Sequence, residues 1–508
     1  MSVLCDSHCL LSCHCFATDP TVSYDFKLSY IAASSLGVPR QVIAVNGKFP
    51  GPTINATTNY NVIVNIHNGL DEPFLMTWNV FAMLFDRNLF TIYDRPGIQM
   101  RKNSWQDGFT GTNYPIPAKW NWTYSFQVKD QIGSFFYSPS LNLQRASGGF
   151  STFVINNRDI IPVPFGQPDG DIILTIGDWY TRNHTTLRSS LDAGKDLGIP
   201  DGVLINGKGP FRYNTSLVPD GISYETVNVV PGPATGPLPD PPNDVYDKTM
   251  SMNQAKSIRQ NVTSSGARPN PQGSFHYGLI NVTDSYFVKA VAPVTIDGKL
   301  RTSLNGISFH NLTTLVRLAD QYNVKGIYKL DFPSKPLDRP PKIDVSLINA
   351  TYKGFIEVVF QNNDTVMQSF HIDGYSFFVV GMDYGDWTEN SRGSYNRWDA
   401  ISRSTTQVYP GGWTTVLISL DSPGAWNIRT ENLDRWYLGQ ETYMRIVNPE
   451  ENGETEMAAP ANVLYCGALA NKHKPEKPTS SAITIRRGNL WLLMTVLWVV
   501  LTYFSVLS

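Results

Sequence analysis

Short stretches of alternating apolar and polar residues recur along the whole chain. β-Branched and aromatic residues fill these stretches, while Gly, Pro, Asn and Asp separate them. Because a period of two places side chains on opposite faces of a strand, the pattern predicts an all-β protein built of sandwiches. The clearest predicted strands are Gln41–Asn46, Val62–Ile66, Tyr124–Val128, Gly149–Ile155, Asp171–Ile176, Phe355–Phe360, Tyr375–Val380, Trp413–Leu420 and Glu441–Val447.

Three similar segments indicate an internal repeat. An apolar strand runs into an Asn/Asp-Gly-Lys turn at Val42–Lys48, Gly202–Lys208 and Pro293–Lys299. A second shared element links Val62–Asn68 to Ile356–Asn362. Repeated openings of this kind predict three sandwich units in tandem.

The spacing of the three turns makes the middle unit short. After Gly232 the sequence enters a Pro-rich stretch, which is typical of an extended linker. We therefore expect a first unit over residues 19–158, a truncated middle unit over 159–232, a Pro-rich linker and connection over 233–275, and a third unit over 276–470.

Composition agrees with several β domains and excludes some functions. At 508 residues the chain is too long for one core, and its 39 Gly and 34 Pro suit many turns. A net charge of −2 gives no electrostatic basis for binding nucleic acid. The sequence has no Gly-rich phosphate loop, His-Glu-x-x-His zinc helix or Gly-x-Ser-x-Gly elbow.

The C-terminal segment, residues 471–508, has the form of a glycolipid (GPI) anchor signal. The uncharged apolar run Leu490–Ser508 follows a spacer and small residues, of which Ser480 or Ser481 is the expected anchor site. The alternative is a tail-anchored transmembrane helix, which would leave the body of the protein in the cytosol.

Glycosylation sequons favour the secretory route and hence the lipid anchor. Nine Asn-X-Ser/Thr tripeptides spread over the chain mark surface sites for N-glycans in a secreted protein. We therefore expect the protein to lie at the extracellular face of the plasma membrane, attached through the lipid, or in the cell wall. The predicted glycosylation sites are Asn55, Asn121, Asn183, Asn214, Asn261, Asn281, Asn311, Asn349 and Asn363.

The N-terminal segment, residues 1–18, is a poor signal peptide. Asp6, His8 and His14 interrupt its apolar stretch, and no basic residue precedes it. Its cysteines, with the two histidines, offer an alternative as a metal cluster, but they form no Cys-x-x-Cys knuckle. The cysteines are Cys5, Cys9, Cys13 and Cys15.

Long ordered runs of residues connect the chain to a known family. Because of these runs, residues 19–470 resemble the plant ascorbate-oxidase-like, "monocopper oxidase-like" proteins of the skewed-root-growth group, which is a branch of the multicopper oxidases. The resemblance implies three cupredoxin-like Greek-key sandwiches, a place outside the cell and, often, a GPI anchor. The runs are Ala44–Thr53, Asn103–Gly108, Pro115–Tyr124, Val128–Tyr137, Gln144–Gly149 and Phe360–Glu389.

The resemblance also places the copper motifs of the family on this sequence, where nearly every ligand is replaced. Copper oxidases need imidazoles in His-x-His pairs and one thiolate. The four motifs fall on Thr77–Asn79, Phe136–Ser140, Gln368–Gly374 and Arg429–Arg435, and among their ligand positions only His371 is a histidine. The replaced positions are Thr77, Asn79, Ser138, Ser140, Gln368, Asp373, Arg429, Thr430, Glu431 and Arg435.

Two interpretations of His371 remain. With Asp373 it could hold a single metal, or it could be a core histidine bonded to neighbouring polar groups. A lone imidazole beside Arg429 and Arg435 favours the second, because a guanidinium cannot release its proton to bind a metal. We expect these arginines and Glu431 to form ion pairs, and no cofactor; copper is implied only by family analogy.

The leading functional hypothesis is a non-catalytic cell-surface glycoprotein that acts in wall organisation or directional growth, as the resemblance implies. One alternative is an ascorbate-oxidase-like oxidoreductase with a reduced copper site. Another is a module that binds wall polysaccharide, with Trp120–Tyr124 stacking on sugars, although aromatic residues in strands more often belong to the core.

Two departures from the family bear on stability. An apolar insert, Val80–Pro96, separates Asn79 from Gly97, which the resemblance makes neighbours. The resemblance also implies a cysteine where Tyr114 stands, bridged to Cys466. Without it Cys466 is unpaired, and a staple of about 2–4 kcal/mol is missing.

Overall fold

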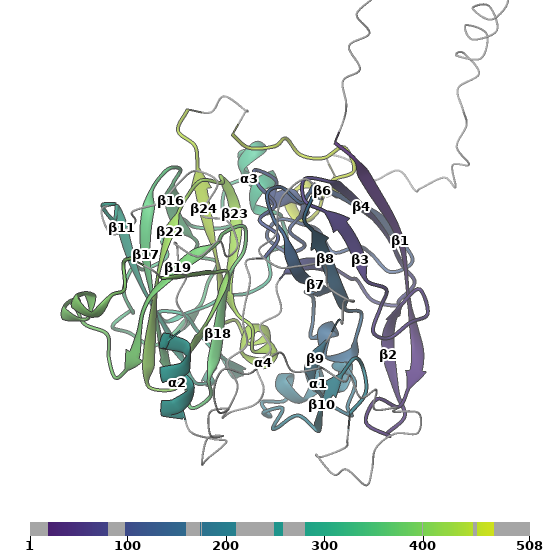
Figure 1. Ribbon diagram of the computed structural model, residues 1–508, viewed down its shortest axis with the longest axis horizontal. Helices are drawn as coiled ribbons and strands as arrows, with labels where there is room; N and C mark the ends of the chain where they lie inside the picture. Colours follow the sequence, from purple (N-terminus) through teal and green to yellow (C-terminus); the bar gives the residue numbers. More distant parts are fainter. Residues whose placement is uncertain are drawn as a thin grey trace, which may run out of the picture.

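The computed structural model describes residues 19–79, 97–158, 173, 175–209, 248–257, 280–398, 400–450 and 455–471. Figure 1 shows two β-sandwiches side by side, the first in purple and blue and the second in green. A smaller part with two strands and a helix lies at the lower end of the first sandwich. The all-β class predicted from alternation is confirmed.

The first sandwich, called domain 1 below, has two four-stranded sheets. Strands with buried residues at every second position enclose its core: Val62, Val64 and Ile66 alternate with less buried neighbours. The first sheet has the order β2 (Arg40–Val45), β1 (Thr21–Ala33), β4 (Asn61–Asn68), β6 (Asn121–Gln127). The second has the order β3 (Ile54–Thr57), β8 (Ser151–Asn156), β7 (Gly133–Pro139), β5 (Met76–Asn79).

The third unit, called domain 3, has two five-stranded sheets. Its strand β17 is buried at eight consecutive positions because both faces are covered. The first sheet has the order β11 (Asp284–Val291), β17 (Phe355–Asn363), β22 (Gly412–Ser419), β19 (Phe377–Tyr384), β20 (Ile401–Arg403). The second has the order β16 (Ile348–Thr351), β24 (Glu441–Val447), β23 (Gly424–Thr430), β18 (Gln368–Ile372), β21 (Thr405–Val408).

Short elements connect these sheets. The pairs β12 (Val294–Ile296) with β13 (Lys299–Arg301) and β14 (Ile307–Ser308) with β15 (Lys342–Ile343) form two-stranded ribbons. Two short helices, α3 (Val316–Gln321) and α4 (Leu433–Tyr437), lie in domain 3. In both domains the first strand runs parallel to a central strand: β1 pairs β4, and β11 pairs β17.

The repeat of Asn-Gly turns is real, but its third member is Asn305 and not Asp297. The side-chain oxygen of Asn46 accepts from the Lys27 amide at 2.7 Å, and Asn206 accepts in the same way from Thr175 at 2.8 Å. In domain 3 the equivalent bond, 2.7 Å, joins Asn305 to the Lys289 amide. Asp297 matches the other two turns in sequence because Gly-Lys follows it. The structural repeat depends instead on the side-chain bond to the first strand of the domain, which Asn305 makes.

The second shared element also recurs in three dimensions. Asn68 ends β4 and its amide donates to the carbonyl of Ile116 at 3.0 Å, while Asn362 near the end of β17 donates to Val408 at 2.9 Å. In each case the side-chain oxygen accepts from a backbone amide two residues further on. The predicted equivalence of Val62–Asn68 and Ile356–Asn362 is therefore confirmed.

The middle segment contains β9 (Ile176–Trp179), paired antiparallel with β10 (Gly202–Ile205), and the helix α1 (His184–Asp192) between them. Asn183 caps α1, because its side chain accepts from the Thr186 amide at 2.9 Å. The guanidinium of Arg40 fixes this segment to domain 1: it lies 4.1 Å from the ring centre of Trp179. Residues 210–247 and 258–279 lie outside the described residues, so the truncation of the middle unit stays a prediction.

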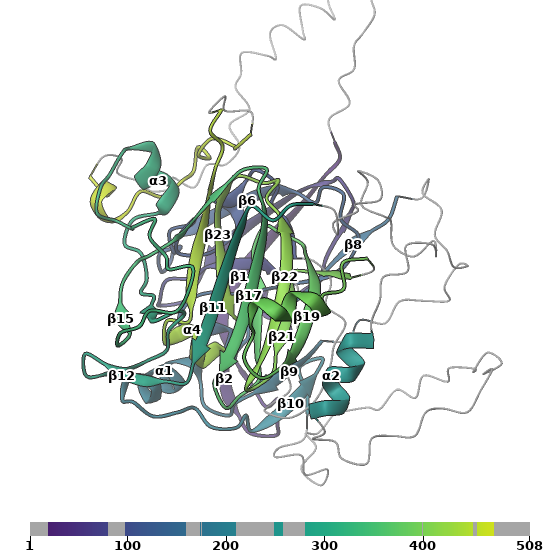
Figure 2. The same ribbon diagram turned by 90° about the vertical axis from the view of Figure 1, so that its left-hand side faces the viewer.

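A helix lies within the predicted linker and connection, after the Pro-rich stretch. Residues Lys248–Ser257 form α2, which Figure 2 shows beside domain 3. Met252 is buried against Met367 and Tyr409, and Ser251 shares a 2.7 Å hydrogen bond with the Tyr409 hydroxyl. These contacts hold a helix whose own helical pattern is weak. The Pro-rich stretch, residues 233–243, lies outside the described residues, so its extended form stays a prediction.

Domains 1 and 3 meet along a polar and aromatic boundary. The Tyr443 hydroxyl accepts from the Gly111 amide at 3.0 Å, and the Gln99 side chain donates to Ser376 at 2.8 Å. Beyond the sheets, the indole of Trp122 donates to the Asn462 carbonyl at 2.8 Å. These bonds place the copper-motif segments of the two domains against each other.

Candidate functional site

The copper-motif positions lie on or just after four strands, two from each domain, except for Arg435, which lies on α4. Thr77 and Ser138 are paired partners on β5 and β7, and His371 and Arg429 are paired partners on β18 and β23. Within domain 1, the hydroxyl of Ser140 donates to the Gly108 carbonyl at 2.5 Å. The residues on either side of Gly108 reach Arg429, as described next. The structure therefore brings together these positions, which are distant in sequence.

Arg429 is the centre of this site. Its side chain is 1% exposed and pairs with Asp373 at 2.6 Å and with Glu431 at 2.8 Å. The guanidinium carbon lies 4.3 Å from the ring centre of Phe109 in domain 1 and 5.0 Å from that of Trp436. A guanidinium stacked on aromatic faces and paired at its edge is well suited to an interior site.

His371 has partners on both ring nitrogens. Its Nε2 lies 2.9 Å from Oδ1 of Asp373, and its Nδ1 lies 2.6 Å from the Thr405 hydroxyl. The other carboxylate oxygen of Asp373 pairs with Arg429. A metal held by His371 and Asp373 would have to displace these partners. In the described part of the chain, no group of three or more His, Cys, Asp or Glu side chains is placed to hold a metal ion.

Glu431 extends the site back into domain 1. Arg145 pairs with its Oε2 at 2.7 Å and donates to its backbone carbonyl at 2.8 Å. Burial by itself would raise the pKa of Glu431, but the charges of Arg429, Arg145 and His371 outweigh it and lower the pKa to about 2. Glu431 is therefore a buried carboxylate that links two arginines from different domains.

Two further carboxyl groups complete what we call the Arg429 cluster: Asp107, Asp373, Arg429, Glu431, Glu441, His371 and Arg145. Burial and then the charge of Asp373 raise the pKa of Asp107, which Arg429 only partly offsets. Burial likewise raises the pKa of Glu441, whose Oε2 accepts from Asn427 at 2.8 Å and from Trp436 at 2.9 Å. Burial therefore makes both groups weaker acids than they are in water, because it disfavours their charged forms.

The expected ion pairs are present, with one correction. Arg429 pairs with Glu431 as expected, but Arg435 pairs with Asp364 at 2.7 Å and Asp434 at 2.6 Å. Asp364 is nearer because the turn after β17 carries it beneath Arg435, a proximity that motif alignment does not reveal. Gln368 donates to the same Asp364 oxygen at 3.3 Å, and Thr430 bonds to Asn432 at 3.3 Å.

Sequence reasoning missed several members of the cluster. Asp107, Arg145 and Glu441 lie outside the copper motifs, as does Asp364, the partner of Arg435, so the motif positions did not indicate them. Arg145 did lie within one of the family-specific runs, Gln144–Gly149, and an arginine there could have been tested as the partner of a buried acid. The burial of these charged residues is a property of the assembled domains.

The aromatic stretch Trp120–Tyr124 belongs to the core. Tyr124 is fully buried and Trp122 is 7% exposed, and their rings meet edge to face at 4.4 Å. Trp120 is partly buried against the same core. These side chains are therefore not a sugar-stacking surface, and the core interpretation is confirmed.

Seven of the nine predicted glycosylation sites lie in the described residues, and none of the seven is buried. Asn214 and Asn261 lie outside the described residues, as do residues 1–18, the insert 80–96 and the tail 472–508. Among the described helices, none has the length and apolar character to cross a membrane.

Cys466 is a free thiol in the interior. It is 3% exposed and packs with Trp105, Leu315 and Leu318. Burial raises the pKa of this thiol to about 11, which makes it unreactive at neutral pH. Tyr114, where the family resemblance implies a cysteine, is 40% exposed.

Family models described as multicopper oxidase match residues 27–88 with 90–160, residues 170–235 and residues 313–452. Together these segments cover more than half of the chain. The chain belongs to the multicopper oxidase family. The resemblance drawn from its sequence motifs is thereby confirmed.

Named relatives place this family member among the plant monocopper oxidase-like proteins. The monocopper oxidase-like proteins SKS1 and SKU5 of Arabidopsis thaliana are both 55% identical to it; the matches cover 96% and 92% of this chain and 95% and 93% of theirs. The L-ascorbate oxidase homolog of Brassica napus is 38% identical over 92% of this chain and 96% of its own.

Solved structures show the same fold. Fet3p, described as a multicopper oxidase that functions in iron import, matches with a TM-score of 0.60 and 14% identity, over 84% of this chain and 90% of that one. The laccase from Botrytis aclada matches with a TM-score of 0.58 and 17% identity, over 84% and 88%. At these identities the likeness shows the fold alone.

The residues at the motif positions do not fit copper. Type-1 copper needs a thiolate, and the residue there is Thr430; the remaining imidazole, His371, already bonds to Asp373 and Thr405. Arg429 adds a fixed positive charge that repels a cation from the same space.

Proposed function

We propose that this chain is a copper-free, non-catalytic multicopper-oxidase relative that acts as a structural glycoprotein outside the plant cell. The observation that carries the proposal is the buried pair of Arg429 with Asp373, which occupies the place of imidazole ligands. Carboxylate, guanidinium and imidazole groups do not carry out electron transfer, so the geometry supports a stabilising role for this site.

The site holds two domains together. Arg145 of domain 1 pairs with Glu431 of domain 3 at 2.7 Å, and the Arg429 guanidinium of domain 3 lies 4.3 Å from the ring centre of Phe109 in domain 1. Within domain 3, Arg429 and Glu431 pair at 2.8 Å. A rigid body of this kind suits a protein that presents its surface to wall components. The proposed place is the outer face of the plasma membrane or the wall, with a GPI lipid added at Ser480 or Ser481. The proposed role is in wall organisation or directional growth.

Metal content and oxygen consumption test the non-catalytic part. The glycosylated protein, purified from a plant secretory host, is incubated with cupric ion, desalted and analysed by mass spectrometry for copper. Oxygen uptake is then measured with ascorbate and with phenols, beside a copper-replete ascorbate oxidase as positive control. We expect sub-stoichiometric copper and no uptake above the protein-free rate. Stoichiometric copper with an absorption band near 600 nm, about the value for a cysteine-bound cupric centre, would overturn the proposal.

Release from membranes tests the location. Phosphatidylinositol-specific phospholipase C is expected to release the protein from intact protoplasts, and a variant truncated after residue 479 is expected to appear in the medium. Retention after phospholipase treatment would instead indicate the transmembrane alternative.

A further inference from the structure

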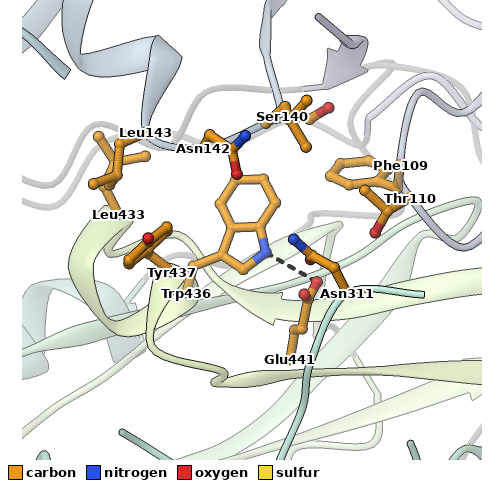
Figure 3. A pocket seen from close by; sticks show the side chains of 11 residues that line it. Phe109, Thr110, Ser140, Asn142, Leu143, Asn311, Leu433, Trp436, Tyr437 and Glu441 are labelled. Atoms are coloured by element: carbon orange, nitrogen blue, oxygen red, sulfur yellow. Dashed lines mark hydrogen bonds between the residues drawn. The ribbon is translucent and has the colours of Figure 1, made fainter. Parts of the chain in front are cut away.

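A small pocket opens between domains 1 and 3, beside the Arg429 cluster (Figure 3). Its interior has a volume of about 40 Å³, and the space that includes the open mouth is about 440 Å³. Domain 1 contributes Phe109 and the segment 140–143, and domain 3 contributes Asn311, the α4 residues Trp436 and Tyr437, and Glu441. We call it the Trp436 pocket.

The Trp436 indole is held in a fixed orientation in this pocket. Its Nε1 donates to Glu441 at 2.9 Å, the bond drawn in Figure 3. Phe109 lies beside it, with ring centres 5.8 Å apart and planes tilted by 49°. Fixed aromatic rings at a pocket wall offer apolar faces without a further loss of side-chain entropy.

Two side-chain amides in the same pocket have unused hydrogen-bonding capacity. Within the part of the chain that the structure describes, neither Asn142 nor Asn311 makes a side-chain hydrogen bond. Asn142 has a φ of 50°, a left-handed conformation that asparagine tolerates better than most residues. Aromatic faces together with free amides fit a sugar, whose C–H faces stack on rings and whose hydroxyl and acetamido groups bond to amides.

The sequence itself supplies a sugar at this pocket. Asn311-Leu312-Thr313 is an N-glycosylation sequon, and Asn311 is exposed at the pocket mouth. In Figure 3 its amide, the atom group to which a glycan is attached, points toward the hollow that contains Trp436. We propose that the first sugars of an N-glycan on Asn311 occupy the Trp436 pocket and clamp domain 1 to domain 3.

Attachment makes weak contacts sufficient. A tethered sugar binds at an effective concentration of roughly millimolar or more, so it needs little intrinsic affinity. The clamp rests on the proposed secretory route, because only that route adds the glycan. In addition, the clamp gives the glycan on Asn311 a structural role between the two domains.

The test compares Thr313→Ala with Asn349→Gln in protein from a eukaryotic secretory host. Thr313→Ala removes the glycan but keeps the Asn311 side chain, and Asn349→Gln removes a glycan from an exposed position on strand β16. We expect Thr313→Ala to lower Tm by about 2–4 °C, the shift typical of losing about 1 kcal/mol in domains of this size, and Asn349→Gln to leave Tm within about 1 °C.

A second variant tests the pocket. Asn142→Ala is expected to lower Tm more in the glycosylated protein than in the Thr313→Ala background, because the strain of alanine at a φ of 50° is common to both and the sugar contact is lost only in the first. Additive effects would contradict the clamp.

Peptide mass spectrometry separates the two proposals. Glycans at other sequons with Asn311 unmodified, or a modified Asn311 whose loss leaves Tm unchanged, would overturn the clamp alone. Absence of glycan from every sequon would overturn the secretory route.

Discussion

Arg429 and Asp373 form an ion pair of 2.6 Å in which each side chain is 1% exposed. In water such a pair is worth little, but here neither group can return to solvent without opening the boundary between the domains. The free energy at stake is therefore the cost of leaving one charge buried without its partner. Arg429 also contacts Phe109 of domain 1, so loss of the Arg429 side chain would weaken the packing between the two domains as well.

Arg429→Met is expected to destabilise the protein strongly. It leaves Asp373 and Glu431 buried without this guanidinium, a loss of about 3–5 kcal/mol in the free energy of unfolding. Arg188→Met is the matched control: it removes a pair with Glu72 at 3.4 Å from a side chain that is 27% exposed, worth about 0.2–1 kcal/mol. Urea denaturation followed by tryptophan fluorescence measures both, and equal small losses would show that the cluster contributes no special stability.

Acid is expected to destabilise the protein through Glu431. Its folded pKa of about 2 is lower than the ordinary value of 4.5 that it regains on unfolding. The stability it contributes is therefore fully present above about pH 4.5 and is lost as the pH falls toward 2. The difference in urea midpoint between the parent and Glu431→Gln should shrink over this range. Burial raises the pKa values of Asp107 and Glu441, so these two groups give an opposite pH dependence of the free energy of unfolding, in the parent and in Glu431→Gln alike. A constant difference would contradict this assignment.

The corrected repeat predicts unequal effects at Asn305 and Asp297. Asn305 is 1% exposed and bonds to Lys289 and Phe287, whereas Asp297 is exposed. Their φ values are 52° and 50°, so the strain of placing alanine in a left-handed turn is the same for both. Asn305→Ala should therefore cost about 1–3 kcal/mol more than Asp297→Ala, because it leaves buried backbone groups without partners. Equal losses in a thermal melt would argue for the original alignment.

Tyr114→Cys is expected to form a bridge with Cys466. The neighbouring Asn113 donates to the Trp105 carbonyl at 2.5 Å, and Trp105 packs in the same cluster as Cys466. Oxidation should remove both thiols from titration under denaturing conditions and stabilise the protein by about 2–4 kcal/mol. The pair Tyr114→Cys with Cys466→Ser is the control, and more titratable thiols in oxidised Tyr114→Cys than in the oxidised parent would contradict the pairing.

Much of the fold could be predicted from the sequence because it depends on local order. The alternation in Val62–Ile66 determines which face of β4 is buried, and Asn46-Gly47 forms a turn because both residues tolerate positive φ, 53° and 70°. The replacement of imidazole and thiolate at the motif positions is likewise visible in the sequence, since a side chain's donor chemistry does not depend on its surroundings.

Tertiary structure decided which residues replace the ligands as partners. The sequence alone predicted that Arg429 and Glu431 pair, but not that Arg145 joins them from domain 1, nor that Arg435 turns to Asp364. Residues far apart in sequence become neighbours only when each sandwich folds, as for Arg435 and Asp364, and when the two sandwiches dock, as for Arg145 and Glu431. The physical reason is that a buried charge requires a partner within a few ångströms, and the folded boundary between the domains determines which groups are that close.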